Sequence, residues 1–500
     1  MKKLYVETAS VGSIYAAGNV VQNVLTVFLL PLYTSYLYPE DFGILALMGI
    51  AVSLITKLAI SPVTSGLARF YYHPDYTEKK GILLGNLFFL LIVKTFFLGT
   101  LYWYFSDFFC RLIFNKRELI AIVKIYTLVL LFTPLSLFLE GFVRLRKMAK
   151  YSIFSSLANF ILSFGLVFYL LVKLKLGILA IVYGNIFSLV FSVAISVPVF
   201  LKYAELKISP LILKEPLKYG YPSVFTGYSN LLFQSGDRYI LRLLDSVNSV
   251  GVYSFGYRIA SLIDMLFVSP LKQALFPLIY KEENNPKGQK KFLVNSATYF
   301  YLLGMFIALA LSLFAKEIIM LLARREEFWQ CWSIVPIIAF SYIQHSLGNF
   351  IGWGLIMRKK SYHISGILFV SAVVNIGLNF IFIPYWGIMG AAFATLISYF
   401  IWNGLKIYYS AKFYNLYFDL KRLSYIAIVG VSLYALTVFI AATDSLFFNI
   451  VIKFLIFFSY PFIFLLSSRF FTKKEREYIE KLWKSIKKKG LYQTYLQIKA

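Results

Sequence analysis

Residues 42–62 read FGILALMGIAVSLITKLAISP, and residues 250–270 read VGVYSFGYRIASLIDMLFVSP. The two segments align without a gap at an offset of 208 residues, and both are apolar enough and long enough to cross a bilayer. Seven residues recur at equivalent positions: Gly43, Ser53, Leu54, Ile55, Leu58, Ser61 and Pro62 return as Gly251, Ser261, Leu262, Ile263, Leu266, Ser269 and Pro270. The match predicts that the chain contains an internal repeat of membrane helices.

Two further matches support this repeat. LGILAIVYGNIFS at 176–188 aligns with WGIMGAAFATLIS at 386–398 at an offset of 210 residues, and Gly141 with Tyr151 aligns with Gly352 and Tyr362 at an offset of 211. The matches pair the second span with the eighth and the sixth with the twelfth, so each repeat holds six helices. An even number of crossings gives both halves the same orientation, with a pseudo-two-fold axis along the membrane normal.

The composition of the chain excludes a soluble globular protein. Of the 500 residues, 59% are hydrophobic and 15% are charged, and the mean hydropathy is +0.72. We expect an all-α integral membrane protein of about fourteen transmembrane helices, as two pseudosymmetric six-helix lobes plus two extra C-terminal helices. The predicted spans are 11-33, 43-65, 82-105, 118-139, 151-172, 176-200, 219-236, 249-271, 293-315, 331-356, 362-384, 387-410, 423-443 and 446-468.

These spans divide the chain into four expected parts. They are an N-terminal lobe at 1-203, a C-terminal lobe at 204-415, spans thirteen and fourteen at 416-470, and a basic amphipathic cytoplasmic tail at 471-500. We expect the N-terminus to be retained as the first span, since its apolar segment is too long for a signal-peptide core.

The charge of the chain predicts its topology. Lys and Arg total 50 against 23 acidic residues, a net charge of +27, and the basic residues gather in alternate loops. The positive-inside bias therefore places both termini in the cytoplasm. Basic runs such as 144-150, 287-291 and 358-360 lie between spans, so they are interpreted as topology determinants facing anionic lipids rather than as a nucleic-acid site.

Neither cysteine nor histidine chemistry is indicated. Cys110 and Cys331 are far apart in the sequence, and His73, His345 and His363 share no metal-ligand spacing. We therefore expect no disulfide framework, no metal site and no cofactor.

Charged residues inside the predicted spans are the first functional candidates, because charge is costly in lipid. Arg258 falls near the midplane of span eight and is the strongest of them; Asp264, about 240° further around the helix, is expected to meet a residue on another helix. Lys57 is a cavity residue or reaches the cytoplasmic surface. Asp237 and Arg238, at the end of span seven, form a surface ion pair or the rim of a pathway.

Polar residues also form stripes on two spans related by the repeat. Gln22 and Thr26 correspond to Asn230 and Gln234 at an offset of 208, and each pair is spaced i,i+4 on one helix face. These faces line a shared cavity or form interhelical hydrogen bonds within the bundle. Asn375 and Asn379 make a third such stripe, interpreted as structural.

Several motifs carry a family resemblance that extends over essentially the whole chain. DFGILAL at 41-47, GDRYIL at 236-241, VGVYSFGYRIA at 250-260 and NIGLNFIFIPYWGIMGAAFATLIS at 375-398 resemble the polysaccharide and O-antigen repeat-unit flippases. This is the Wzx-type branch of the multidrug/oligosaccharidyl-lipid/polysaccharide exporter superfamily. No single motif is diagnostic, but their order and spacing are specific.

The resemblance implies a substrate and a mechanism. An oligosaccharide on polyprenyl pyrophosphate would pass from the cytoplasmic to the outer leaflet of a bacterial inner membrane by alternating access, with membrane lipids and polysaccharide polymerase machinery as partners. Arg258 and Lys57 would supply the basic partners of the pyrophosphate. Coupling to a proton or sodium gradient occurs in the superfamily, and Asp264 and Glu140 are candidate coupling acids between which the sequence does not choose.

Three alternatives stay open at the level of sequence. A multidrug exporter of the same superfamily would need acidic rather than basic cavity residues, and a flippase for lipid-linked peptidoglycan precursors would need the same basic ones. A membrane glycosyltransferase or polymerase would use an acidic pair such as Glu40 and Asp41. The outer loops are short, however, and a helix N-terminus near Asp41 explains that pair better, so we expect no enzyme.

Overall fold

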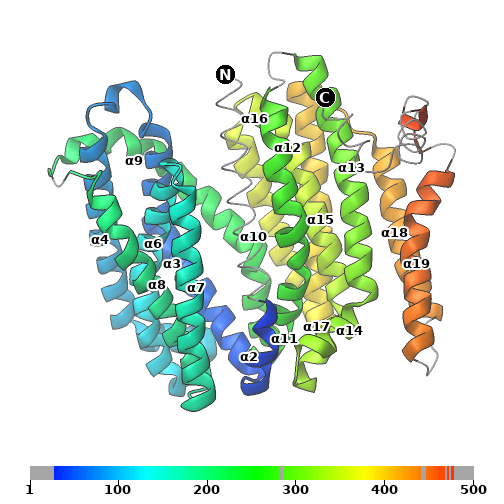
Figure 1. Cartoon of the computed structure of the whole chain (residues 1–500), viewed down its shortest axis with the longest axis horizontal. Coiled ribbons are helices and arrows are strands. Elements are labelled where there is room, and N and C mark those ends of the chain that lie inside the picture. The colour runs from blue at the N-terminus through cyan, green and yellow to red at the C-terminus, as the bar shows by residue number, and fades with distance from the viewer. Residues whose placement is uncertain are drawn as a thin grey trace. The chain divides into compact units, whose positions relative to one another are not determined.

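The computed structural model describes residues 27–205, 207–281, 285–440, 446–467, 470–471 and 475–477, and within these ranges the regular structure is helical (Figure 1). Apolar segments form helices in lipid because a helix satisfies its own backbone hydrogen bonds. The first helices are α2 (Leu30–Tyr36), α3 (Pro39–Phe70), α4 (Lys80–Tyr104), α5 (Ser106–Phe114), α6 (Ile120–Leu145), α7 (Ala149–Phe168), α8 (Ile178–Leu201) and α9 (Lys214–Gly220). They are followed by α10 (Pro222–Leu244), α11 (Val247–Ala260), α12 (Ser269–Lys281), α13 (Pro286–Leu313), α14 (Ala315–Leu322), α15 (Val335–Ile351), α16 (Trp353–Met357), α17 (Ser361–Tyr414), α18 (Leu420–Ile440) and α19 (Leu446–Leu466).

Ten described helices are long and apolar enough to cross a membrane, or eleven if Glu326–Ser333 and Val335–Met357, bent by 51°, form one span. Helix α17 has 54 residues and would extend about 80 Å, far more than one crossing of about 30 Å. It is broken at Gly387 (φ 52°, ψ −129°) and contains the predicted spans 362-384 and 387-410. Most of the predicted span 11-33 and of the tail 471-500 lies outside the described residues.

The chain divides into two compact units. The first comprises the described residues of 1–297 and 315–418, and the second comprises those of 298–314 and 419–500. In the second unit α18 and α19 pack with the C-terminal part of α13: the rings of Phe306 and Phe457 stack at 4.2 Å, and the Tyr460 hydroxyl donates to the Leu302 carbonyl oxygen at 3.0 Å. These two helices correspond to the predicted spans thirteen and fourteen.

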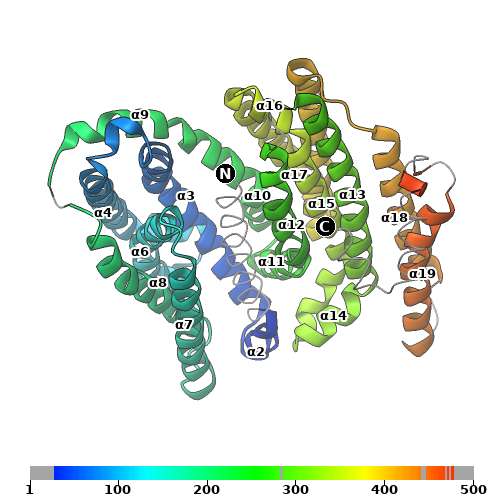
Figure 2. The same cartoon turned by 45° about the horizontal axis from the view of Figure 1, so that its top comes forward.

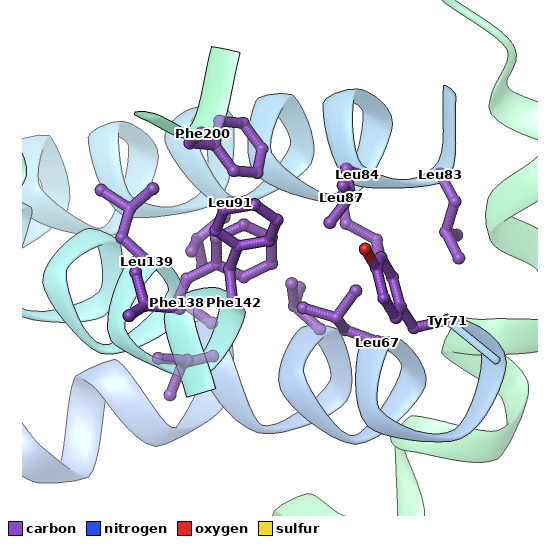
Figure 3. Close-up of a cluster of buried hydrophobic side chains, with 14 residues drawn as sticks. Leu67, Tyr71, Leu83, Leu84, Leu87, Leu91, Phe138, Leu139, Phe142 and Phe200 are labelled. Carbon is purple, nitrogen blue, oxygen red and sulfur yellow. The ribbon is translucent and has the colours of Figure 1, made fainter. Parts of the chain in front are cut away.

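Within the first unit, α3, α4, α6 and α8 share an apolar core (Figure 3). Its fully buried side chains interdigitate, with Leu87 and Leu91 of α4 facing Phe138 and Phe142 of α6, while Phe200 of α8 closes the layer. Helix α7 packs on α8, and these helices form one group in both views (Figures 1 and 2).

The second group of helices in this unit is built on α10, α11, α15 and α17, which pack against one another. Phe233 of α10 meets Tyr399 and Trp402 of α17 in its core, with ring centroids 4.8 and 6.2 Å apart. A π-helical segment, Asp264–Val268, joins α11 to α12. These four helices position most of the predicted site residues.

Helix α3 joins the two groups, because it packs against α9, α10 and α11. Where α3 crosses α11, Gly43 lies on the backbone of Val247 and Gly251 lies on the carbonyl of Pro39, so a Cβ at either glycine would overlap a backbone oxygen. The two contacts are reciprocal under the repeat. At the offset of 208 residues, Pro39 corresponds to Val247 and Gly43 corresponds to Gly251, so each glycine contacts the residue that corresponds to the other glycine's partner. Such exchange is typical of an interface with two-fold symmetry.

Candidate functional site

A polar face of α10 is exposed within a helix that otherwise packs into the bundle. Asn230 and Gln234 are exposed, and the Gln234 Nε2 group donates to Asn230 Oδ1 at 3.2 Å. One turn further, the Arg238 Nη1 group donates to the Gln234 carbonyl oxygen at 3.1 Å. Exposed amide groups along one face, with a guanidinium at its end, indicate contact with water or a polar ligand rather than with lipid tails.

Asp237 and Arg238 are not at a surface, because α10 continues to Leu244. The Asp237 side chain is 2% exposed and accepts the Tyr253 hydroxyl at 2.6 Å, and its Oδ1 lies 3.4 Å from Arg238 Nη1. The Arg238 guanidinium lies over the Tyr257 ring at 4.5 Å and its Nε group donates to Ser254 Oγ at 3.3 Å. The alternative of a surface ion pair was therefore wrong: burial and the α11 side chains hold Arg238 in place.

Arg258 lies one turn from Ser254 on α11 and is exposed. Since residues i and i+4 share a helix face, it lies on the side of α11 that meets Arg238. It interacts electrostatically with the Tyr33 hydroxyl of α2, and among the described residues no carboxylate lies within 4 Å of its guanidinium. Its charge is thus available to a ligand.

The structure does not bring Lys57 next to Arg258. Lys57 of α3 is half-buried and packs against Gly227 of α10, about three turns away from Arg238. Lys94 of α4 reaches the same end of α10, where its Nζ group donates to the Tyr221 hydroxyl at 3.3 Å. The two lysines therefore lie at one end of the polar face of α10 and the two arginines lie at the other.

The candidate coupling acids have local partners. Asp264 has partners on its own bent helix: Lys272 Nζ lies 3.8 Å from its Oδ1, and the Ser269 hydroxyl donates to its Oδ2 at 3.0 Å. From another helix, Tyr342 of α15 interacts with it electrostatically, as the sequence led us to expect. Glu140 of α6 is exposed and accepts the Ser136 hydroxyl at 3.2 Å. Glu140 and Asp264 belong to different helix groups, so they do not form one acidic site.

Sequence reasoning missed a set of buried side chains on α15 and α17. His345 stacks on Trp402 with ring centroids 5.3 Å apart, the Lys406 ammonium lies 3.3 Å from the centroid of the same indole, and Lys406 Nζ donates to the Gly348 carbonyl oxygen at 3.0 Å. Tyr342 lies beside Tyr257, 5.6 Å between centroids. Lys406 lies inside the predicted span 387-410. A lysine within an apolar span was therefore the sequence feature that could have identified this set.

Two further predictions are settled by these contacts. Asn375 and Asn379 are fully buried, and Asn379 Nδ2 donates to the Asn375 carbonyl oxygen at 2.8 Å, so this stripe is structural in the described chain. Lys453, near the outer edge of the predicted span 446-468, is predicted by its position to reach the membrane surface, but it is buried beside Phe314 in the second unit. Gln22 and Thr26 lie outside the described residues.

Glu40 and Asp41 have structural partners. The Asp41 carboxylate accepts the Tyr38 backbone N–H at 2.9 Å and so caps the start of α3. Glu40 pairs with Lys116 at 2.6 Å, and this hydrogen bond raises the pKa of the Lys116 ammonium. A pair engaged in this way does not resemble two catalytic carboxylates. Among the described residues no cluster of His, Cys, Asp and Glu could hold a metal ion.

A sequence model for a family described as polysaccharide biosynthesis protein matches residues 35–326. A curated relative, described as a probable low-salt glycan biosynthesis flippase of Haloferax volcanii, is 25% identical over 247 residues, 48% of this chain and 52% of the relative. The chain thus matches about half the length of that relative.

Solved structures share the fold at low sequence identity. The lipid II flippase MurJ in an inward closed conformation gives a TM-score of 0.72 at 16% identity, over 90% of this chain and 98% of that one. An inward-facing multidrug resistance MATE family transporter of the MOP superfamily gives a TM-score of 0.61 at 14% identity, over 83% of this chain and 95% of that one. A MOP superfamily transporter from Pyrococcus furiosus gives a TM-score of 0.56 at 16% identity, over 84% of this chain and 97% of that one. These matches confirm the prediction of an all-helical membrane protein, with a fold like that of MurJ and the MATE transporters.

Proposed function

Because this chain belongs to the polysaccharide biosynthesis protein family and has the fold of MOP superfamily transporters, we propose that it flips a lipid-linked oligosaccharide across a membrane. The prediction of a transporter family rather than an enzyme is confirmed by the same membership and fold. The curated relative, itself described as a glycan flippase, supports the choice of a glycan as cargo.

The observation that carries the proposal is the basic and polar character of the face formed by α10 and α11. Arg258 is exposed without a carboxylate partner among the described residues, beside Arg238 and the exposed amides of Asn230 and Gln234. A pyrophosphate needs cationic donors in a low-dielectric cavity, and a glycan needs amide and hydroxyl partners. An organic cation would instead be repelled, which argues against multidrug export.

The proposed transporter has fourteen spans, with lobes at 1-203 and 204-415 that alternate access around this face, and both termini in the cytoplasm. Three observations support it: the reciprocal contacts of Gly43 and Gly251, the two crossings contained in α17, and the polar helix α10, which fits a cavity wall. Arg258 holds the pyrophosphate, while Lys57, about three turns of α10 away from Arg238, contacts the substrate at the other end of the polar face. Asn230 and Gln234, with Gln22 and Thr26 under the repeat, line the glycan path, and Asp237 with Arg238 completes it.

The proposed cargo is a polyprenyl-pyrophosphate-linked repeat unit for O-antigen or another surface polysaccharide, moved from the cytoplasmic to the outer leaflet of a bacterial inner membrane. The finished unit would pass to polysaccharide polymerase machinery. Transport would draw on a proton or sodium gradient.

A deletion strain tests this function. We expect a complete oligosaccharide unit to accumulate on its polyprenyl carrier on the cytoplasmic face while surface polysaccharide disappears. Accumulation of the lipid-linked peptidoglycan precursor instead would assign the chain to that branch. Unchanged surface glycan with increased drug sensitivity would favour an exporter, and truncated units would contradict transport altogether.

A further inference from the structure

The ion pair between Asp264 and Lys272 is weaker than a structural pair inside a membrane protein should be. Asp264 Oδ1 and Lys272 Nζ are 3.8 Å apart, and among the described residues Lys272 has no hydrogen-bond partner. The two side chains are 35% and 20% exposed. Desolvating a lysine is costly unless a close partner compensates for it, so a loosely paired lysine in this position indicates that a second partner binds there.

The π-helical segment is what places these two residues on one face. In an uninterrupted α-helix, residues eight apart are separated by about 80° around the axis. The π-turn at Asp264–Val268 adds one residue, so Lys272 follows Asp264 as if seven residues on, within about 20° of the same face. Lys272 then reaches back along the helix toward Asp264. Single π-turns of this kind are frequent at functional sites.

Two further basic side chains lie near the pair. His345 of α15 interacts electrostatically with both Lys272 and Lys406. Lys406 is buried, and no carboxylate of the described residues lies within 4 Å of its ammonium. Phe276, one turn after Lys272, packs on Phe350 with ring centroids 5.4 Å apart, which turns this face of α12 toward α15. The basic side chains of α15 and α17 are further partners for an anion bound at Lys272, since both nitrogen groups can donate hydrogen bonds.

The pair also connects to the site on α10. Tyr342 of α15 interacts electrostatically with Asp264 and with Arg238, and its ring lies beside Tyr257, on which Arg238 stacks. Tyr257 and Tyr342 therefore lie between Arg238 and the Asp264–Lys272 pair, and Tyr342 interacts with both.

We propose that Lys272 is a second binding residue for the phosphate groups of the substrate and that Asp264 occupies it until the substrate arrives. The inference rests on the proposed function. The incoming phosphate displaces the carboxylate, which keeps its hydrogen bond from Ser269, and Lys272 exchanges one anion for another. Asp264 thereby prevents the free cation from trapping other anions.

Substitutions of Asp264 and Lys272 should change the affinity for pyrophosphate in opposite directions, and this difference tests the assignment. The full chain is reconstituted in nanodiscs, and binding of inorganic pyrophosphate is measured by calorimetry. Asp264→Asn should tighten binding by about fivefold, since the competing carboxylate is gone, and Lys272→Gln should weaken it by about the same factor. The double variant should bind like Lys272→Gln. Asp107→Asn, which neutralises an exposed acid on α5, is the control for net charge and should change nothing.

A structural ion pair would give a different pattern. If Asp264→Asn and Lys272→Gln both weaken binding, or neither alters it, while Arg258→Ala still does, Lys272 is not a ligand and the proposed function stands. If the wild type binds no pyrophosphate, both proposals are overturned. Thermal unfolding of each variant identifies misfolding. As a second measurement, pyrophosphate should slow maleimide labelling of Lys272→Cys, and an unchanged labelling rate would reject the site.

Discussion

At the scale of single residues, the arginines of the polar face differ in how they are held. Arg238 is fixed by Asp237, Ser254 and Tyr257, whereas Arg258 has only an electrostatic interaction with Tyr33 among the described neighbours. A guanidinium without a fixed partner can move with a bound anion, while a fixed one shapes the cavity.

Replacing Arg258 should therefore remove function without unfolding the protein. We expect Arg258→Ala to abolish glycan export and Arg258→Lys to retain part of it, because a lysine keeps the charge but not the bidentate geometry. Export of surface polysaccharide in the deletion strain is the measurement. Lys124→Ala is the control, since Lys124 of α6 is exposed and its ammonium lies over the Trp103 ring of α4. Normal export by Arg258→Ala would remove this residue from the mechanism.

Replacing Asp237 should mainly reduce stability. Asp237→Asn leaves Arg238 without its buried carboxylate, and loss of one partner of a buried pair costs about 3 kcal/mol. The matched control is Asp107→Asn, whose pair with Arg111 is about half exposed and should contribute no more than about 0.5 kcal/mol. The free energy of unfolding in detergent compares the two, and equal losses would mean that burial of Asp237 is not decisive.

The sequence reveals charges but not their partners. Arg258, Asp264 and Asp237 could be selected because ionisable residues stand out in apolar spans. The partner of Asp264 could not, because the π-turn changes the helical register by one residue and no sequence pattern marks it. Lys406 was identifiable by the same criterion as Arg258 and was overlooked.

At the scale of helices, the crossing of α3 and α11 depends on two glycines. Gly43 and Gly251 allow each helix to approach the backbone of the other more closely than any Cβ would permit. The repeat alignment shows that both glycines recur, but the reciprocity of their contacts needs coordinates.

A side chain at this crossing should separate the helices. We expect Gly251→Val and Gly43→Val each to destabilise the protein by about 3 kcal/mol or more, to similar extents, since both overlap a backbone oxygen. Gly404→Ala on α17 is the control: a Cβ there meets nothing within 4 Å, and alanine should stabilise the helix by up to about 1 kcal/mol. Thermal unfolding measures all three. A large difference between the destabilisation by Gly43→Val and that by Gly251→Val would contradict the two-fold relation.

Helix boundaries were predictable where the apolar runs are long. They were less predictable where charged or polar residues interrupt a helix. The predicted span 219-236 stopped where Asp237 begins, yet α10 continues to Leu244 because tyrosines of α11 cover the charges. Propensity and hydropathy describe one helix at a time, whereas this boundary depends on a neighbour.

At the scale of the molecule, contacts between the two helix groups of the first unit should break and reform during transport. Ser65 of α3 and Ser223 of α10 join them, with their hydroxyl oxygens 3.0 Å apart. We expect a disulfide between Ser65→Cys and Ser223→Cys to block export and a reductant to restore it. A disulfide between Ser136→Cys and Ser192→Cys, whose hydroxyls are 2.9 Å apart within one group, should leave export intact.

The crosslinks have a clear opposite outcome. Export that continues with the Ser65–Ser223 disulfide formed would mean that α3 and α10 move as one body. The membrane class was predictable at this scale, since it follows from hydropathy. The repeat stays a prediction, which the reciprocal contacts of Gly43 and Gly251 support. Which helices meet between the repeats was not predictable, because neither hydropathy nor periodicity specifies contacts.

The reciprocal crossing of α3 and α11 has the geometry of a homodimer interface whose two subunits happen to share one polypeptide. In a true homodimer one mutation alters both sides of the axis at once, but here each side can change alone. The two halves are therefore free to diverge, and they differ in charge: Arg258 of α11 and Asp264 of the π-helical segment correspond to Ile50 and Thr56 of α3. Because both halves belong to one polypeptide, a symmetric arrangement of helices can carry charged side chains in one half and uncharged ones at the equivalent positions of the other.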